Sequence, residues 1–406
     1  MAAKRRSVVL HFDLNRTVLM SDAAGGRTME NTVDYLLSEC TWGYVNPQSP
    51  SEWVCVSDAS TINPPEAATD TPQLISYKQF VDETHPYQSL ATAKDSDIDQ
   101  IKAVNKAAKK KRTALQSAFT GGDDAPGRRV RGSFDEVMQK LHFPDGQREA
   151  AKQLAANMPK CRLQEAWSEG RYYLLPSFLQ FLSYLASPQV TAKNDVKLVF
   201  RTFGDDIVEV AKELELLVDG QHPVGLPALP ERFRLKLEPS ARCVGTFYRD
   251  GFEADGTALA VGTLTKVPFS SKLAEEGASA PNNFYAADTE VQVVRGFQPI
   301  QETLDAMLQE SSTLALRDYW EWWSAHAEDG QYGKLLLVDE KKDNIAVFFD
   351  DHIEAHHSHI VDVRDVSGAP VDFEKSRGKY LQRVEPFAAI TDPNYFTSLF
   401  DKYVNK

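Results

Sequence analysis

The segment VVLHF, residues 8–12, and the polar positions after it limit the folds open to this chain more than any other stretch. Four of its five residues are apolar, which is typical of a strand buried on both faces. A carboxylate, an amide and a hydroxyl then occupy alternate positions at Asp13, Asn15 and Thr17. The sequence therefore predicts a buried strand that leads into a polar loop.

Two later segments repeat this pattern. DVKLVFRT, residues 195–202, ends on Thr202, and IAVFFDD, residues 345–351, ends on Asp350 and Asp351. Strands that alternate with helices form parallel βαβ units, in which ligands bind beyond the carboxyl ends of the strands. We therefore expect these three strand ends to meet at one edge of a parallel sheet.

Charge and cysteine content exclude several classes of protein. The net charge of −13 disfavours nucleic acid as the main partner, because a phosphate backbone requires a basic surface. The four cysteines form no CxxC pair, which favours a reducing compartment and disfavours a structural zinc site. No apolar run approaches the roughly 18 residues of a transmembrane helix. We expect a cytoplasmic protein with no membrane partner.

One local basic run stands against this acidic background. Residues 109–112 read KKKR. They fit the solvated face of a helix, and they also fit a nuclear localisation signal.

The distribution of strand and helix patterns predicts an interrupted α/β domain. Turn-rich segments and helical patterns predict a large helical insertion at residues 28–190, and short strands with turns predict a smaller β-rich insertion at 218–297. The core then consists of residues 1–27, 191–217 and 298–406. Within it, one helix is expected over residues 299–326, followed by strands on either side of a polar turn.

The three strand ends resemble the motifs of the haloacid dehalogenase-like (HAD) superfamily. Its first motif, DxDx[TV], is matched by residues 13–17, Asp-Leu-Asn-Arg-Thr. Thr202 matches the second motif, and the acidic pair at residues 350–351 matches the fourth. The third motif is a Lys or Arg, and both Lys334 and Arg317 qualify by their order in the chain. The resemblance covers residues 7–27, 190–217 and 298–370.

The resemblance implies a doubly wound, mostly parallel α/β core and a Mg²⁺-dependent phosphatase or phosphotransferase. Its substrate is a small phosphorylated molecule, and Asp13 is the nucleophile that forms an aspartyl-phosphate. Thr202 and Lys334 or Arg317 bind the phosphoryl oxygens. The implied ligands of Mg²⁺ are Asp13, Asp350, the backbone carbonyl of Asn15 and Asp351. The inserted regions take the position of caps, and the sequence predicts neither the substrate nor the oligomeric state.

Asn15 departs from the family pattern. Phosphatases of the family carry an Asp there, which protonates the leaving group and then deprotonates the attacking water. An amide forms hydrogen bonds but exchanges no proton near neutral pH. General acid–base catalysis is typically worth about 10²–10⁴-fold in rate. Asn15 is therefore compatible with a slow enzyme, and also with a catalytically impaired binding or regulatory protein that retains the metal and phosphate pocket.

A histidine cluster follows the acidic pair. It consists of His352, His356, His357 and His359. Imidazoles bind transition metals, and on a helix the first two would share a face. The alternative is a polar loop between two strands, with the histidines partly exposed. A third interpretation is that one of these histidines supplies the proton that Asn15 lacks.

Overall fold

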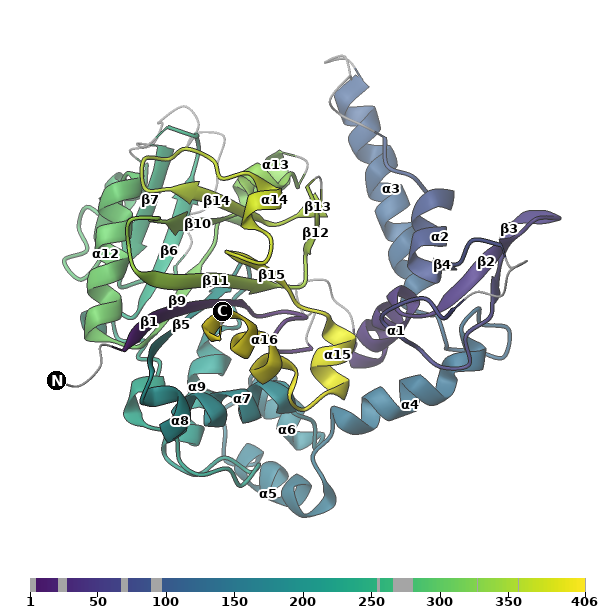
Figure 1. Ribbon diagram of the computed structural model, residues 1–406, viewed down its shortest axis with the longest axis horizontal. Coiled ribbons are helices and arrows are strands. Elements are labelled where there is room, and N and C mark those ends of the chain that lie inside the picture. The colour runs from purple at the N-terminus through teal and green to yellow at the C-terminus, as the bar shows by residue number, and fades with distance from the viewer. Residues whose placement is uncertain are drawn as a thin grey trace. The chain divides into compact units, whose positions relative to one another are not determined.

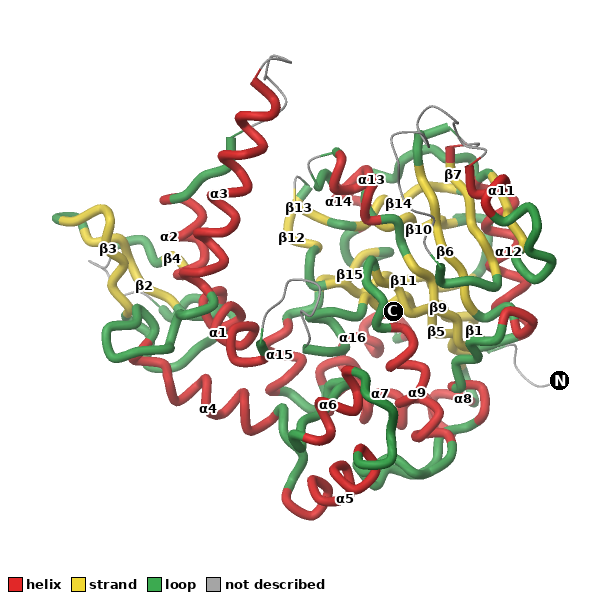
Figure 2. Tube along the Cα trace, turned by 180° about the vertical axis from the view of Figure 1, so that it is seen from behind, coloured by secondary structure: helices red, strands yellow, loops and turns green. Residues whose placement is uncertain are grey.

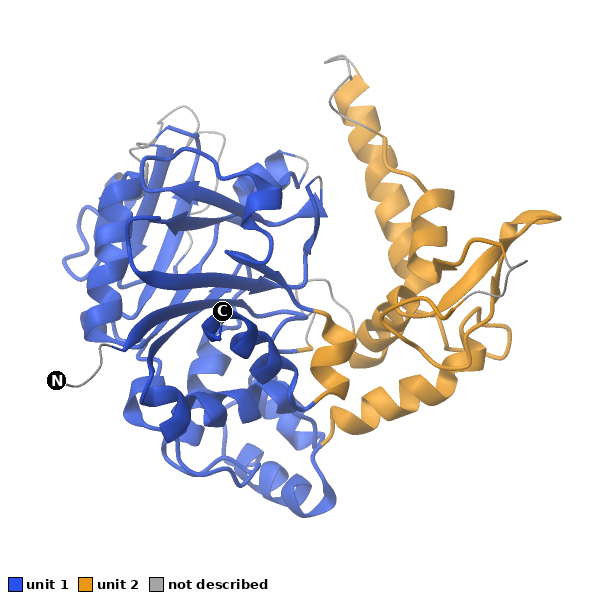
Figure 3. Ribbon diagram, viewed as in Figure 1, with its two compact units in different colours: residues 1–19, 143–384, 393–406 blue, residues 20–142, 385–392 orange. Residues whose placement is uncertain are grey.

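The fold is described from a computed structural model. It covers residues 5–20, 28–66, 72–88, 97–253, 256–265, 280–326, 328–356 and 358–405. The chain forms two compact units (Figure 3). Unit 1 comprises Met1–Leu19, Phe143–Val384 and Pro393–Lys406, and unit 2 comprises Met20–His142 and Glu385–Asp392.

An eight-stranded sheet forms the centre of unit 1. Its strands follow the order β15 (Leu381–Arg383), β11 (Asn344–Asp350), β1 (Arg6–Asp13), β5 (Asn194–Thr202), β9 (Thr313–Arg317), β6 (Val244–Arg249), β7 (Thr257–Val261) and β8 (Gln292–Arg295). The pairings from β15 to β6 are all parallel, and β7 runs antiparallel to both of its neighbours. The prediction of an α/β fold with a mostly parallel sheet is confirmed.

Strand β1 is central because its two faces serve different layers. Phe12 packs edge-on against Phe178 and Phe396 on one face, with ring centroids 5.1 and 6.0 Å away. His11 points to the opposite face and stacks on Phe348 of β11 at 5.7 Å. Side chains alternate along a strand, so Asp13 lies on the same face as His11.

Helices cover the Phe12 face of the sheet. They include α7 (Pro176–Ala186), α8 (Pro188–Thr191), α9 (Ile207–Val218) and α16 (Tyr395–Val404) (Figures 1 and 2). The helices α5 (Asp145–Ala155) and α6 (Arg162–Ser168) pack against each other beside them. Helix α7 begins with a proline and buries a continuous aromatic and aliphatic face, which explains its docking against β1.

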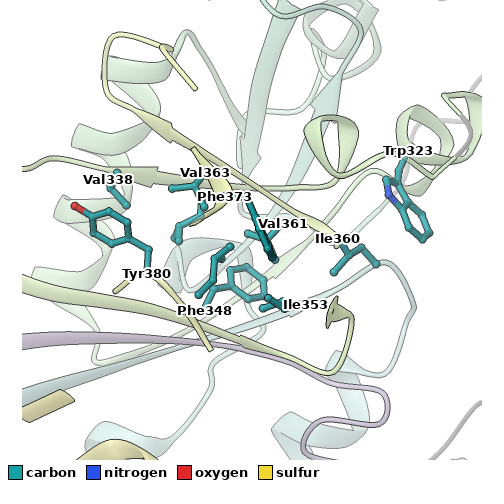
Figure 4. Packing of buried hydrophobic residues seen from close by; sticks show 11 residues of the cluster. Trp323, Val338, Phe348, Ile353, Ile360, Val361, Val363, Phe373 and Tyr380 are labelled. Carbon is teal, nitrogen blue, oxygen red and sulfur yellow. The ribbon is translucent and has the colours of Figure 1, made fainter. Parts of the chain in front are cut away.

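The His11 face is covered differently. Strand β10 (Lys334–Val338) pairs in parallel with β14 (Val361–Asp365) as a separate two-stranded sheet. Leu336, Val338 and Val363 of this small sheet share one buried hydrophobic cluster with Phe348 of the large sheet. Figure 4 shows the packing of this cluster. Helix α12 (Phe297–Glu310) contacts β7, β8 and β9. The remaining short elements are α11 (Ala280–Phe284), α13 (Trp320–Ala325), α14 (Phe373–Ser376) and the hairpin β12 (Ile353–Ala355) with β13 (Ser358–His359).

Unit 2 combines helices with a small antiparallel sheet. Its helices are α1 (Met29–Glu39), α2 (Tyr77–Thr84), α3 (Ile98–Gln116), α4 (Arg131–Lys140) and α15 (Pro386–Thr391). Its sheet has the order β3 (Ser49–Cys55), β2 (Trp42–Asn46) and β4 (Ile75–Ser76). The buried Asp34 of α1 fixes the segment after α3, because its carboxylate accepts hydrogen bonds from the backbone N–H and the hydroxyl of Thr120, at 2.9 and 2.5 Å.

The boundaries of the two units differ from the boundaries predicted for the two insertions. Residues 143–190, assigned by sequence to the helical insertion at 28–190, lie in unit 1. Likewise β6, β7 and β8 fall within the predicted insertion at 218–297 but extend the central sheet. Composition marks where the secondary structure changes, but it carries no information on which apolar face a helix or strand packs against.

The prediction of a single helix over residues 299–326 is wrong. Helix α12 ends at Glu310, strand β9 follows, and α13 begins at Trp320. The strand TLALR is only five residues long and lies between two helical patterns, so its alternation is hidden. This correction moves Arg317 from a helix to the carboxyl end of a central strand.

The basic run at residues 109–112 lies on α3. Lys109, Lys110 and Lys111 are exposed, and Arg112 pairs with Asp82 at 3.0 Å. Within the described ranges, no helix combines the length and the apolar composition needed to cross a membrane.

Phe12→Ala tests the central position of β1. The ring is fully buried and contacts aromatic rings of α7, β11 and α16. We expect its truncation to lower the free energy of unfolding of unit 1 by about 3–5 kcal/mol, as measured by urea denaturation. Val208→Ala, at a site that is 55% exposed, is the matched control and should change it by less than about 0.5 kcal/mol. Equal effects of the two substitutions would contradict this packing.

Candidate active site

A buried lysine joins two of the predicted acidic residues. Asp13 ends β1, Asp350 ends β11, and these strands are neighbours in the sheet. Lys334 begins β10 in the small sheet above them. Its Nζ donates to Oδ1 of Asp13 and, at 2.8 Å, to Oδ2 of Asp350. The three side chains are at most 9% exposed, so a compact charged centre lies at the carboxyl edge of the strands.

Burial and neighbouring opposite charges shift the pKa values of Lys334 and Asp13 in opposite directions. Burial alone would lower the pKa of Lys334, but the charges of Asp13 and Asp350 outweigh it and hold that pKa above its ordinary value. Burial raises the pKa of Asp13 well above its usual range; Lys334 opposes this, while Asp350 and Asp351 add to it. A single ammonium therefore leaves the carboxylates incompletely balanced, and Lys334 remains protonated.

Asp351 brings a third carboxylate to the centre. One oxygen each from Asp13, Asp350 and Asp351 lies within 4.8 Å of the others, and this is the only such group of three possible metal ligands in the described part of the chain. Carboxylate oxygens are the ligands that Mg²⁺ prefers, and the three carboxylates exceed the two nearby cations, Lys334 and Arg16, by one negative charge. The donor set and its charge thus fit a hard divalent metal.

The loop after β1 is a tight turn that supports this acidic group. The carbonyl of Leu14 accepts hydrogen bonds from the backbone N–H groups of Thr17, Val18 and Leu19 at 3.0–3.2 Å. Arg16 adopts a left-handed conformation with a φ of 61°, which is uncommon for a residue with a side chain. This turn directs Arg16 to Asp351, with Nε 3.3 Å from Oδ2.

Thr17 connects the same loop to β11. Its buried Oγ1 accepts a hydrogen bond from the backbone N–H of Asp351 at 3.2 Å. The N–H of His352 donates to Asp350 at 2.9 Å. The two strand ends that carry the carboxylates are therefore held in place by backbone hydrogen bonds as well as by Lys334.

Asn15 faces a carboxylate that sequence reasoning missed. Its Nδ2 donates to Oδ2 of Asp206 at 3.1 Å. Asp206 immediately precedes α9 and is 2% exposed. Burial raises its pKa above the ordinary value, although Arg162 and the Asn15 amide both oppose the shift. A carboxylate at position 15 would meet a second carboxylate here, whereas an amide donates to it.

Thr202 lies near Asn15 and Asp206, and Gly204 stands between the three side chains. The backbone N–H of Gly204 donates to Oγ1 of Thr202 at 2.8 Å. A Cβ at position 204 would lie 2.8 Å from Oδ2 of Asp206, 3.2 Å from Oγ1 of Thr202 and 3.7 Å from Nδ2 of Asn15. The three polar side chains therefore surround a site that only glycine leaves open.

Arg162 fixes Asp206 from the other side. Its Nη1 lies 2.9 Å from carboxylate oxygens of both Asp205 and Asp206, and its Nε pairs with Glu209 at 3.1 Å. The hydroxyl of Tyr173 also donates to Asp206 at 3.4 Å. Arg162, Asn15 and Tyr173 together bind both carboxylate oxygens of Asp206. The acidic pair Asp205-Asp206, shortly after Thr202, was the sequence signal that could have identified this residue.

The two candidate cations lie in different surroundings. Lys334 contacts Asp13 and Asp350 directly, and its Nζ lies 5.3 Å from the ring centroid of Phe203. Arg317 is the register partner of Thr202 at the end of β9, but its Nη1 donates to the carbonyl of Leu264 at 3.1 Å. Lys334 is therefore the cation that the fold brings to the carboxylates.

The histidines form no metal centre among the described residues. Residues 353–355 and 358–359 form a hairpin, so His352 and His356 do not share a helix face. His352 lies 6.0 Å from the ring of Trp323, and His359 packs on Phe373 at 4.5 Å, where burial lowers its pKa. His357 lies outside the described residues.

Comparison with known proteins adds no family assignment. No protein family model, no curated protein sequence and no solved structure matches the chain.

The acidic group should bind Mg²⁺. Asp350→Asn and Asp351→Asn each remove a charge from it, and we expect either to weaken Mg²⁺ binding at least about tenfold in isothermal titration calorimetry. The control is Asp343→Asn, an exposed carboxylate in the turn between β10 and β11, which should bind like the wild type. Equal affinities in all four proteins would exclude this metal site.

Proposed function

We propose that the chain is a HAD-like protein that catalyses Mg²⁺-dependent phosphoryl hydrolysis or transfer from a small phosphorylated substrate. The contact of Lys334 with both Asp13 and Asp350 carries this proposal. It supports the resemblance because the nucleophile, the cation and the acidic pair come from segments far apart in the sequence and meet at one edge of the sheet. Fold class alone would not support an activity, since one fold serves many functions.

Each residue of the centre has a role in this proposal. Asp13 attacks phosphorus with a carboxylate oxygen, so that an O–P bond forms as the bond to the leaving oxygen breaks. Lys334 and Thr202 bind the phosphoryl oxygens. Asp13, Asp350, Asp351 and the backbone carbonyl of Asn15 would hold Mg²⁺, which supplies charge stabilisation for the transferring group. Water or an acceptor hydroxyl then attacks the aspartyl-phosphate and regenerates Asp13.

Asn15 sets the rate in this proposal. It supplies no proton to the leaving oxygen, so substrates with good leaving groups react fastest. The carboxylate of Asp206 accepts a hydrogen bond from the Asn15 amide at 3.1 Å, and this bond orients the amide. The lack of an ionisable acid at position 15 favours a second function, a binding or regulatory protein that retains a phosphate pocket with little or no turnover.

Substitution at positions 13 and 15 tests the enzymatic role. With Mg²⁺ and an activated aryl phosphate, Asp13→Asn should lower kcat/KM at least about 10³-fold, because it removes the nucleophile. Asn15→Asp should raise turnover of an alkyl phosphate by about 10²-fold and that of the aryl phosphate much less, because only the poor leaving group needs a proton. Asp343→Asn is again the control and should match the wild type.

The outcomes separate the two functions. Turnover that is unchanged in Asp13→Asn would exclude Asp13 as the nucleophile. If no variant turns over either substrate but inorganic phosphate binds with Mg²⁺ in calorimetry, the binding or regulatory function holds instead. If neither turnover nor phosphate binding occurs, both are excluded.

A further inference from the structure

Unit 1 contains a cavity that the proposed phosphoryl-transfer chemistry does not use. Its volume is about 330 Å³. Ligand pockets start at about 300 Å³. The cavity lies on the His11 face of the large sheet, between that sheet, β10 and α12. All of its lining residues belong to unit 1 and to the described part of the chain.

The cavity has an apolar body. Val9 and Val199 from neighbouring strands form part of the sheet wall, and Leu335 and Leu337 of β10 also line the cavity. Along α12 the lining positions are Gln301, Leu304, Asp305 and Leu308, which share one helix face. The aliphatic side chains of these walls suit the burial of an apolar molecular body.

Two of the polar lining residues, His11 and Arg201, have buried side chains. His11 is 8% exposed, and its buried Nδ1 has no hydrogen-bond partner. Arg201 is 1% exposed and uses Nε and Nη2 to bind Asp318 and the carbonyl of Leu335. Among the described residues no acceptor hydrogen-bonds to Nη1 of Arg201, so the guanidinium retains an N–H donor. A hydrogen-bond acceptor on a ligand would satisfy it.

Charge at the cavity favours a neutral ligand. The Arg201 charge is already balanced by the carboxylate of Asp318, with an N–O distance of 2.9 Å. At the exposed end, Lys342 pairs with Asp305, and Lys379 pairs with Glu340 at 2.7 Å. A carboxylate entering here would bring a charge with no free counter-ion into a low-dielectric space, which is costly.

We propose that this cavity binds an uncharged, mainly apolar small molecule that carries one hydrogen-bond acceptor, such as an aryl ketone, against Arg201 and His11. The site is separate from the acidic centre but adjoins it. Arg201 is the register partner of Asp13, and Leu335 follows Lys334 directly. The inference does not depend on the proposed phosphoryl transfer, because it concerns binding alone.

Three matched probes test the ligand class by equilibrium dialysis with the full chain. They are 2-acetylnaphthalene, 2-ethylnaphthalene and 2-naphthoate, which share an aromatic body and differ in the acceptor and the charge. We expect one equivalent of the ketone to bind about tenfold more tightly than the hydrocarbon, the value of one net hydrogen bond. The carboxylate should bind more weakly than the ketone. Equal binding of ketone and hydrocarbon, or tightest binding of the carboxylate, would overturn the ligand class.

Two filling variants test the location. Leu308→Trp enlarges a half-buried lining residue of α12, and Ala346→Leu narrows the cavity from β11. Each should weaken binding of the ketone at least tenfold. Ala306→Trp, at an exposed position of the same helix, is the matched control and should bind like the wild type. No binding of any probe to the wild type, or undiminished binding to folded filling variants, would overturn the proposal; circular dichroism establishes that each variant is folded.

Discussion

The ion pairs of Lys334 are the interaction that sets the geometry of the candidate site in unit 1. Removing an ammonium and two carboxylates from water is costly, and only close pairing compensates for it. Lys334 meets this requirement through Asp13 and Asp350, on two adjacent parallel strands. Deleting one partner of a buried ion pair typically costs about 3–5 kcal/mol. The small sheet that carries Lys334 must therefore sit over the carboxyl edge of the large one, and this fixes the geometry of the site.

A second constraint explains the unusual residue in the first loop. Asp206 is held next to Asn15 by Arg162 at 2.9 Å, and Gly204 leaves the space for it. Two carboxylates at this distance would repel each other unless they shared a proton. The amide avoids this repulsion and donates a hydrogen bond to Asp206 instead, so the local electrostatics suit Asn15 at this position.

Sequence reasoning could find the ends of β1 and β11 because the signals are local. An apolar run followed by Asp13, or by Asp350, is visible within ten residues. It could not choose between Lys334 and Arg317, since both precede the acidic pair and only the stacking of two sheets decides which one reaches Asp13. The contact of Asn15 with Asp206 joins residues 191 positions apart, and no local pattern encodes such a distance.

Helix and strand assignment failed where elements are short or pack unexpectedly. Strand β9 is five residues long and was hidden between two helices. Helix α7 reads as part of a helical insertion, yet its aromatic face covers β1. In both cases tertiary packing, which depends on partners elsewhere in the chain, overrides the local pattern.

The most direct test of the account is chemical trapping of Asp13. The full chain is mixed with Mg²⁺ and an activated aryl phosphate, quenched in acid and reduced with borohydride, which converts an aspartyl-phosphate to homoserine. Because Asn15 supplies no base for hydrolysis, the intermediate should accumulate, and mass spectrometry should locate homoserine at position 13 alone. Homoserine at another carboxylate, or unmodified Asp13 in protein that releases phosphate, would contradict the account.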